Sequence, residues 1–134
     1  MRLEKVTNYT KVRDFHKKFG IKAGAIGHIP PVDRVLLRTR LMVEELGELV
    51  EAMQKQDYVN AAKECADLLY VVYGAAVEFG FPIDEVFHEV HRSNMTKTPA
   101  VDRGGKLTKG DNYDPADVVA VLDREIRKRA PCNR

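Results

Sequence analysis

The sequence predicts an all-α protein, a bundle of about five helices that is completed by dimerisation. Apolar residues recur at spacings of three and four along most of the chain, while alternating β-branched residues are scarce. Glycine and proline separate the periodic segments. The chain has 134 residues, of which 44% are hydrophobic and 31% are charged, so we expect one globular domain over 1–134.

The first two helices are expected over 4–19 and 32–56, on either side of a loop. Apolar side chains fall near one face of the first segment, and Gly20 ends it. Two glycines and two prolines mark 21–31 as the loop. The second helical segment carries an apolar stripe that is centred on Leu46.

The third and fourth helices are expected over 58–79 and 82–94. Asp57 can cap the third helix with its carboxylate, and Gly80 is expected to end that helix. Pro82 suits the start of the fourth helix, because the first turn of a helix does not need its missing N–H.

The last third of the chain is expected to be a loop followed by a helix. Residues 96–113 are rich in glycine, lysine and threonine and have no helical period, which indicates an ordered loop or a mobile flap. Asp114 is the expected N-cap of the closing helix, with Pro115 at its first position and the remainder over 116–129.

The composition disfavours several classes of protein. The chain has 22 basic and 20 acidic residues, a net charge of +2, and this is no basic footprint for nucleic acid. The longest apolar run, 68–77, is too short to span a bilayer, and the stretch that begins with Met1 and Arg2 lacks a secretion signal. We therefore expect a cytoplasmic protein. Cys65 and Cys132 lie far apart without metal-ligand spacing, so neither a disulfide nor a zinc site is expected.

Acidic residues cluster on the second expected helix. At about 100° per residue, Glu44, Glu45 and Glu48 fall on one arc that is turned away from the apolar stripe. Glu51 extends this arc. Taken alone, such an arrangement is more typical of a solvated helix face than of a functional site.

Two further carboxylates interrupt an apolar helix. Glu64 and Asp67 are three residues apart on the third segment, which is apolar nearly all round. Unpaired charges there are costly, so a positive group must compensate them. One candidate is an Arg or Lys side chain. The other is a divalent cation that also binds Glu45 and Glu48, and an all-oxygen site of this kind suits Mg²⁺ or Mn²⁺ better than Zn²⁺.

The two acidic segments resemble the signature of a known superfamily. The EExxE…ExxD pattern of the all-α nucleoside triphosphate pyrophosphatases is matched by Glu44-Glu45-Leu46-Gly47-Glu48 and, after fifteen residues, by Glu64-Cys65-Ala66-Asp67. This superfamily includes MazG, the dimeric dUTPases, the dCTP pyrophosphatases and phosphoribosyl-ATP pyrophosphohydrolase. The tail from His91 to Asp117 is similar to that of a MazG-like subgroup, so the resemblance extends over about 10–120.

The resemblance implies a reaction and a set of ligands. Members of the superfamily cleave nucleoside triphosphates between the α and β phosphates and release a monophosphate and pyrophosphate. The implied ligands of Mg²⁺, with Mn²⁺ as a substitute, are Glu45, Glu48, Glu64 and Asp67. Glu44 is implied to orient or deprotonate the attacking water, or to hold a further metal, so all five acids count as catalytic. The tail favours dUTP or non-standard nucleotides and a house-cleaning role.

The tail also supplies the expected contacts to the substrate. By resemblance, its side chains meet the sugar or the phosphates. The basic loop over 96–113 would then be a lid that closes over the phosphates, and a solvated loop with no specific role is the alternative. The expected substrate-binding residues are Asn94, Lys97, Lys106, Lys109 and Tyr113.

The amphipathic faces predict a two-fold assembly. The second and third helices carry more apolar and acidic surface than one thin bundle can bury, and a homodimer that completes the bundle would cover it. Some members of the superfamily pair again into tetramers. The expected partners are a nucleoside triphosphate and a second copy of the chain, without nucleic acid or a membrane.

Other interpretations stay open. The chain could be a non-catalytic dimerisation or adaptor module whose carboxylates pair with Arg and Lys across a subunit interface. Arg38 and Arg40 either neutralise the acids or contact a phosphate. Cys65 is expected to pack rather than to act as a nucleophile, because the acids beside it raise the cost of a thiolate. The basic end of the last helix, Arg124 to Arg129, suits the helix dipole more simply than it suits DNA.

Overall fold

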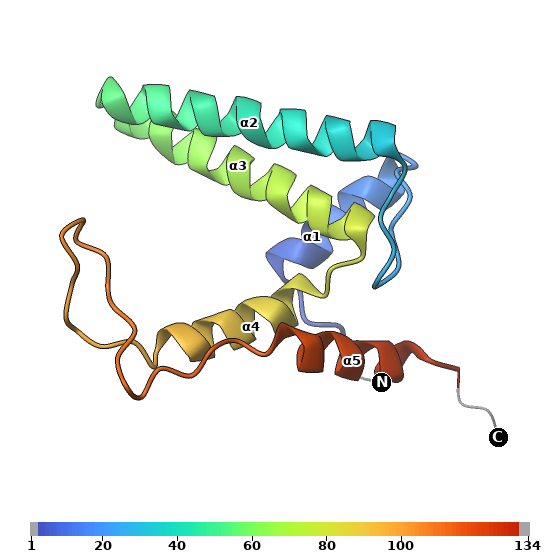
Figure 1. Ribbon diagram of the computed structural model, residues 1–134. Coiled ribbons are helices and arrows are strands. Elements are labelled where there is room, and N and C mark those ends of the chain that lie inside the picture. The colour runs from blue at the N-terminus through green and yellow to red at the C-terminus, as the bar shows by residue number, and fades with distance from the viewer. Residues whose placement is uncertain (1–2, 132–134) are drawn as a thin grey trace. The chain divides into compact units, whose positions relative to one another are not determined.

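The structure is a computed structural model that describes residues 3–131 (Figure 1). Regular structure in these residues is helical, apart from one isolated antiparallel bridge between Val101 and Leu107. The predicted all-α class with five helices is therefore confirmed. The helices are α1 Asn8–Lys18, α2 Val32–Gln54, α3 Tyr58–Phe79, α4 Ile83–Asn94 and α5 Val118–Arg129.

The chain divides into two compact units, residues 1–81 and 82–134. The first unit holds α1, α2 and α3, and the second holds α4, α5 and the loop between them. Within the described range, no helix is by itself both long and apolar enough to cross a membrane. Met1, Arg2 and Cys132, which entered the predictions above, lie outside the described residues.

The start of α1 differs from the prediction, which placed it at Glu4. The helix is capped by Thr7, whose hydroxyl accepts from the Thr10 N–H at 3.2 Å, while the Thr10 hydroxyl accepts from the Thr7 N–H at 2.8 Å. This reciprocal capping box satisfies two backbone donors, so the helix begins after Thr7. Glu4 lies outside the helix and accepts two hydrogen bonds from Arg13, at 2.8 and 3.0 Å.

Helices α2 and α3 form an antiparallel pair and lie side by side (Figure 1). As predicted, Asp57 caps α3 by accepting from the Asn60 N–H at 3.1 Å. Gly80 ends α3, also as predicted, with a φ of 69° that suits a residue without a Cβ. The second helix ends at Gln54 rather than Gln56, because the chain turns where Gln56 has a φ of 57°.

A buried ion cluster joins the N-terminal half of α2 to the C-terminal end of α3. The Glu78 carboxylate is 4% exposed and lies 2.6 Å from Arg34 Nε and 2.7 Å from Arg38 Nε. Gly74 makes room for this cluster, since a Cβ there would lie 2.3 Å from Arg38 Nη1. Arg38 thus pairs with Glu78 and not with the predicted site acids, and its contact with a phosphate stays a prediction.

The second unit is held together by a different ion network. Glu89 on α4 accepts from Arg92 at 2.8 and 2.9 Å and from the backbone N–H of Asp117 at 2.9 Å. Asp117 caps α5 by accepting from the Ala120 N–H at 3.0 Å. The predicted cap, Asp114, is wrong because its carboxylate pairs with Arg92 at 2.8 Å, and α5 begins at Val118.

The loop between α4 and α5 has its own hydrogen bonds. The Thr98 N–H donates to the Thr108 carbonyl at 3.1 Å, and the Asp102 N–H donates to the Lys106 carbonyl at 2.9 Å. Together with the Val101–Leu107 bridge, these bonds make a short hairpin. Both forms expected for 96–113, an ordered loop and a mobile flap, stay predictions, since a hairpin with internal bonds can be either.

The apolar stripes of the first unit are only partly covered within one chain. Leu46 and Met53 of α2 are 49% and 61% exposed, and Leu69 of α3 is 50% exposed. The fully buried apolar residues of this unit are mostly small, such as Ala52 and Ala76. A single chain therefore leaves much of the predicted apolar surface open to solvent.

Removing the charge of Glu78 should destabilise the protein. The substitution Glu78→Gln leaves two neighbouring guanidinium groups without their carboxylate, and the loss of one partner from a buried ion pair costs about 3 kcal/mol. Urea denaturation measures the change. Glu51→Gln, which breaks an exposed pair with Lys55, is the matched control and should leave the midpoint unchanged, and equal midpoints for both variants would contradict the role of Glu78.

The stability contribution of Glu89 should depend on pH. Its hydrogen bonds with Arg92 lower the pKa of Glu89 from 4.5 to about 2. A lowered carboxyl pKa stabilises the folded state above pH 4.5, and this stabilisation is lost as the pH falls toward 2. Glu89→Gln should therefore lower the unfolding temperature at pH 7 and converge with the wild type at low pH. A difference that stays constant down to pH 2 is incompatible with this account.

Candidate functional site

The antiparallel pairing of α2 and α3 brings the two acidic segments together. Glu45, Glu48 and Glu64 each offer one carboxylate oxygen, and these three oxygens lie within 4.8 Å of one another. Glu45 and Glu48 come from neighbouring positions on one face of α2, three residues apart, and Glu64 faces them from α3. We call these three residues the acidic cluster.

The acidic cluster is partly buried, and its negative charge is only partly compensated. Glu64 is 5% exposed, and one oxygen each of Glu64 and Glu45 is buried without a hydrogen-bond partner in the described part of the chain. Burial, and then the charge of Glu48, raises the pKa of Glu45. A hydrogen bond with Glu64 and its charge raise the pKa of Glu48. Carboxylates held this close favour either a bound proton or a cation.

Asp67 lies beside the acidic cluster but does not belong to it. Its carboxylate accepts from Lys63 Nζ at 2.7 Å, and the same ammonium lies 3.1 Å from Glu64 Oε1. These contacts raise the pKa of Lys63. Asp67 is near enough to raise the pKa of Glu45 by its charge. Lys63 thus supplies part of the positive charge that was expected to compensate Glu64 and Asp67.

Lys63 is a residue that the sequence analysis did not single out. It precedes Glu64 directly and stands four positions before Asp67, the spacing at which helical side chains meet. This spacing was available as a signal in the sequence.

Glu44, the fifth predicted acid, is placed at the rim. Its side chain is 57% exposed and lies 3.9 Å from Arg40, one turn earlier on α2. Glu44 is therefore well hydrated, in contrast to Glu64. Cys65 is exposed, so the expectation that it packs in the interior is wrong within the single chain.

The acidic cluster fits a divalent cation by the chemistry of its donors. All three donors are carboxylate oxygens, the ligands that Mg²⁺ prefers. The buried oxygens of Glu45 and Glu64 that lack hydrogen-bond partners among residues 3–131 are free to bind one. Burial of Glu64 fixes one donor, while the exposed Glu48 leaves the cluster accessible from solvent.

Several predicted substrate-binding residues come together in the second unit. The Lys109 ammonium lies 4.9 Å from the centre of the Tyr113 ring. The Tyr113 hydroxyl is 3.4 Å from the Ser93 hydroxyl, and this bond, with the charges of Lys109 and Lys97, lowers the pKa of Tyr113. Lys97, Lys109 and Tyr113 thus form a basic patch that suits an anion.

The other two predicted tail residues lie at the edges of structural elements. Asn94 is exposed at the last position of α4, and its carbonyl accepts from the Lys97 N–H at 3.2 Å. Lys106 lies in the hairpin, where its N–H donates to Asp102 at 3.0 Å and its carbonyl accepts from the Asp102 N–H. Among the described residues, no contact joins the Lys106 side chain to Tyr113.

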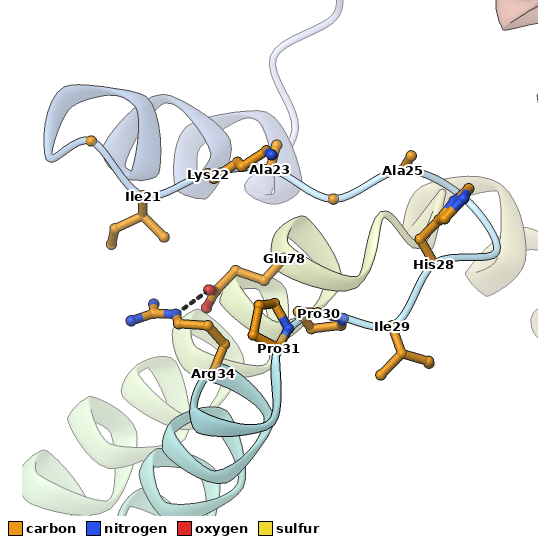
Figure 2. A pocket seen from close by; sticks show the side chains of 12 residues that line it. Ile21, Lys22, Ala23, Ala25, His28, Ile29, Pro30, Pro31, Arg34 and Glu78 are labelled. Carbon is orange, nitrogen blue, oxygen red and sulfur yellow. Dashed lines mark hydrogen bonds and ion pairs between the residues drawn. The ribbon is translucent and has the colours of Figure 1, made fainter.

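A pocket of about 620 Å³ lies under the loop over 20–31 (Figure 2). Arg34 and Glu78 reach it from α2 and α3 and pair with each other between Ile21 and Pro31. Arg34 is eleven residues from Glu45, or about 16 Å along the helix. The Glu78 carboxylate is paired with two arginines and Lys22 also lines the pocket, so this pocket has no excess of negative charge, unlike the acidic cluster. Its sequence signal is the glycine- and proline-rich loop that precedes Arg34.

Comparisons with known proteins agree with the superfamily resemblance. Residues 12–94 match the family described as phosphoribosyl-ATP pyrophosphohydrolase. Over 85 residues, or 60% of its length, the chain is 39% identical to an uncharacterized protein of Acanthamoeba polyphaga mimivirus. The matched part is 34% of that protein, so the chain spans about a third of the length of this curated relative. The family match contains both acidic segments and ends at Asn94, before the other tail residues.

Neutralising one carboxylate of the acidic cluster should stabilise the cation-free protein. Glu48→Gln removes one of three like charges and replaces it with an amide that can donate to Glu64, so the unfolding temperature in EDTA should rise. Glu44→Gln is the comparison at the rim: the charge of Glu44 contributes least to the raised pKa of Glu48, so this variant should produce a smaller rise. Thermal unfolding followed by circular dichroism measures both variants. Equal shifts for Glu48→Gln and Glu44→Gln would show that the cluster stores no repulsion.

Proposed function

The chain belongs to the phosphoribosyl-ATP pyrophosphohydrolase family, within the all-α nucleoside triphosphate pyrophosphatase superfamily, and on this basis we propose that it is a cation-dependent nucleotide pyrophosphohydrolase. The reaction is the hydrolysis of a nucleoside triphosphate between the α and β phosphates, which yields a monophosphate and pyrophosphate. The observation that supports it best is the convergence of three carboxylate oxygens from α2 and α3 within 4.8 Å.

The proposed cofactor is Mg²⁺, with Mn²⁺ as a substitute. Glu45, Glu48 and Glu64 would hold the cation, and Asp67 would join them when its carboxylate turns from Lys63. When bound, the cation neutralises phosphate oxygens and lowers the pKa of a coordinated water. A buried Glu64 supports this proposal, because a carboxylate held in one position orients what it binds without further loss of entropy.

The remaining predicted residues have roles in handling water and substrate. The rim position and hydration of Glu44 suit a group that orients the attacking water or takes its proton. Lys97, Lys109 and Tyr113 would bind the phosphates or the sugar, with Asn94 beside them and Lys106 on the hairpin. In this proposal the loop over 96–113 is a lid that closes over the phosphates.

For the substrate we propose deoxynucleotides, with dUTP or a non-standard nucleotide first, on the strength of the MazG-like tail. The family name points to phosphoribosyl-ATP as the alternative. Both substrates carry the same triphosphate, so the acidic cluster does not distinguish them, and the groups that bind the base and sugar must. A house-cleaning role and a cytoplasmic location are part of the same proposal.

We further propose that the enzyme is a homodimer, which can pair again into a tetramer. Support comes from the half-exposed apolar residues of α2 and α3, among them Leu46 and Leu69. A second copy of the same helices would cover these residues and complete the bundle.

A non-catalytic dimerisation or adaptor module is the alternative function. In that case the carboxylates of the acidic cluster would pair with lysine or arginine of the partner. Mg²⁺ would then have little effect on stability, and neutralising the acids would weaken self-association. The enzyme proposal requires the reverse on both points.

Substitutions in the acidic cluster should abolish turnover while the fold persists. With Mg²⁺, Glu45→Gln and Glu64→Gln should each lower pyrophosphate release by roughly 100-fold or more, because each removes a charged ligand. The assay follows pyrophosphate and monophosphate over a panel of dUTP, other nucleoside triphosphates and phosphoribosyl-ATP. Circular dichroism checks that the helices remain.

The control for these variants is Glu51→Gln. Glu51 follows the cluster by one turn on α2, pairs with Lys55, and should keep wild-type activity. If no nucleotide releases pyrophosphate from the wild type with Mg²⁺ or Mn²⁺, the proposed function fails.

A further inference from the structure

Lys63 is a cationic side chain that lies against the acidic cluster and bridges it to Asp67. Its ammonium group lies 3.1 Å from Glu64 Oε1 and 2.7 Å from Asp67 Oδ2. In residues 3–131, no other lysine or arginine forms an ion pair with Glu64 or Asp67. Lys63 therefore uses one oxygen of each of two carboxylates that the superfamily resemblance implies as cation ligands.

The charge of Lys63 is too small to balance its surroundings. Glu45 interacts electrostatically with Glu48, Glu64 and Asp67, and the one ammonium group near these acids in the described residues is that of Lys63. A buried oxygen of Glu64 and one of Glu45 keep no hydrogen-bond partner among the described residues even with Lys63 in place. The negative charge of these carboxylates is thus only partly neutralised. A divalent cation in place of the singly charged ammonium group would neutralise more of it.

Lys63 is also able to leave. Its side chain is 64% exposed, and its pair with the partly exposed Asp67 is of the surface kind that contributes little to stability, so the pair with the buried Glu64 is the contact that holds it. The four-carbon stem can carry the ammonium group into solvent without disturbing α3. Lys63 contacts Glu64 Oε1, whereas Glu64 Oε2 has no hydrogen-bond partner among the described residues, so a divalent cation bound at Oε2 would compete with the ammonium group through charge repulsion rather than for the same atom.

From these contacts we infer that Lys63 is an internal counter-ion, which holds Glu64 and Asp67 in the cation-free protein and is displaced when a divalent cation binds. Lys63 is then a positioning residue that weakens cation binding and preserves the cluster in the absence of the cation. The inference rests on the proposed cation dependence, and it assigns to Lys63 an effect opposite to that of a ligand.

The test is a calorimetric titration of Mg²⁺, repeated with Mn²⁺, into the full chain and its variants. Lys63→Gln removes the competing charge and should bind the cation roughly threefold to tenfold more tightly than the wild type. In EDTA the same variant should unfold at a lower temperature, because the acids lose their counter-ion. Lys63→Arg keeps the charge and should remain close to the wild type in both measurements.

Lys55→Gln is the matched control. Lys55 pairs with Glu51 at the same i,i+4 separation on a helix and is 67% exposed, yet it lies outside the acidic cluster. Its removal should leave cation affinity unchanged.

Two results would overturn the inference. If the wild type binds Mg²⁺ and Lys63→Gln binds it equally or more weakly, Lys63 is a structural or ligand-supporting residue and the proposed function survives alone. If neither the wild type nor Lys63→Gln binds either cation, both the inference and the proposed function fail.

Discussion

Repulsion between carboxylates on two packed helices is the constraint around which this protein is organised. Helices α2 and α3 hold Glu45, Glu48 and Glu64 with their oxygens within 4.8 Å, and Glu64 is almost fully buried. Folding alone gains nothing from such an arrangement, because like charges in a partly buried site destabilise the folded state. The cation that we propose would offset this cost.

The rest of the first unit keeps the acids in place. At the opposite end of the α2–α3 pair, Glu78 is neutralised by Arg34 and Arg38, and this buried cluster fixes the relative positions of the two helices. The two ends are built on opposite principles. At one end a single carboxylate is paired with two guanidinium groups of the same chain, whereas at the other end three carboxylates lie beside one lysine.

Much of this could be predicted from the sequence, and the failures have physical causes. The helical period and the local chemistry of Asp57 and Gly80 placed α3 correctly, since a cap depends on a few adjacent residues. The start of α5 was missed because Asp114 and Asp117 are both good caps, and the choice depends on Arg92, which is distant in sequence. The Glu78 cluster depends on the pairing of α2 with α3, and helical periodicity does not indicate which helices pair.

The acids themselves show the same division. Periodicity placed the acids of each helix on one face of that helix, and the superfamily resemblance implied that the two sets meet; the family match at residues 12–94 agrees with this resemblance. Which oxygens meet is a matter of side-chain geometry, and there Lys63 holds Asp67 outside the acidic cluster. The spacing of four residues between Lys63 and Asp67 indicates this pair, because the acids need a counter-ion when no cation is bound.

The most direct measurement is a crystal structure of the protein grown with Mn²⁺, with anomalous scattering recorded to locate the ion. We expect an anomalous peak that places a Mn²⁺ ion within bonding distance of carboxylate oxygens of Glu45, Glu48 and Glu64. The proposed cation site is contradicted if the cluster holds no peak at saturating Mn²⁺ and each of these carboxylates is paired with a lysine or arginine instead.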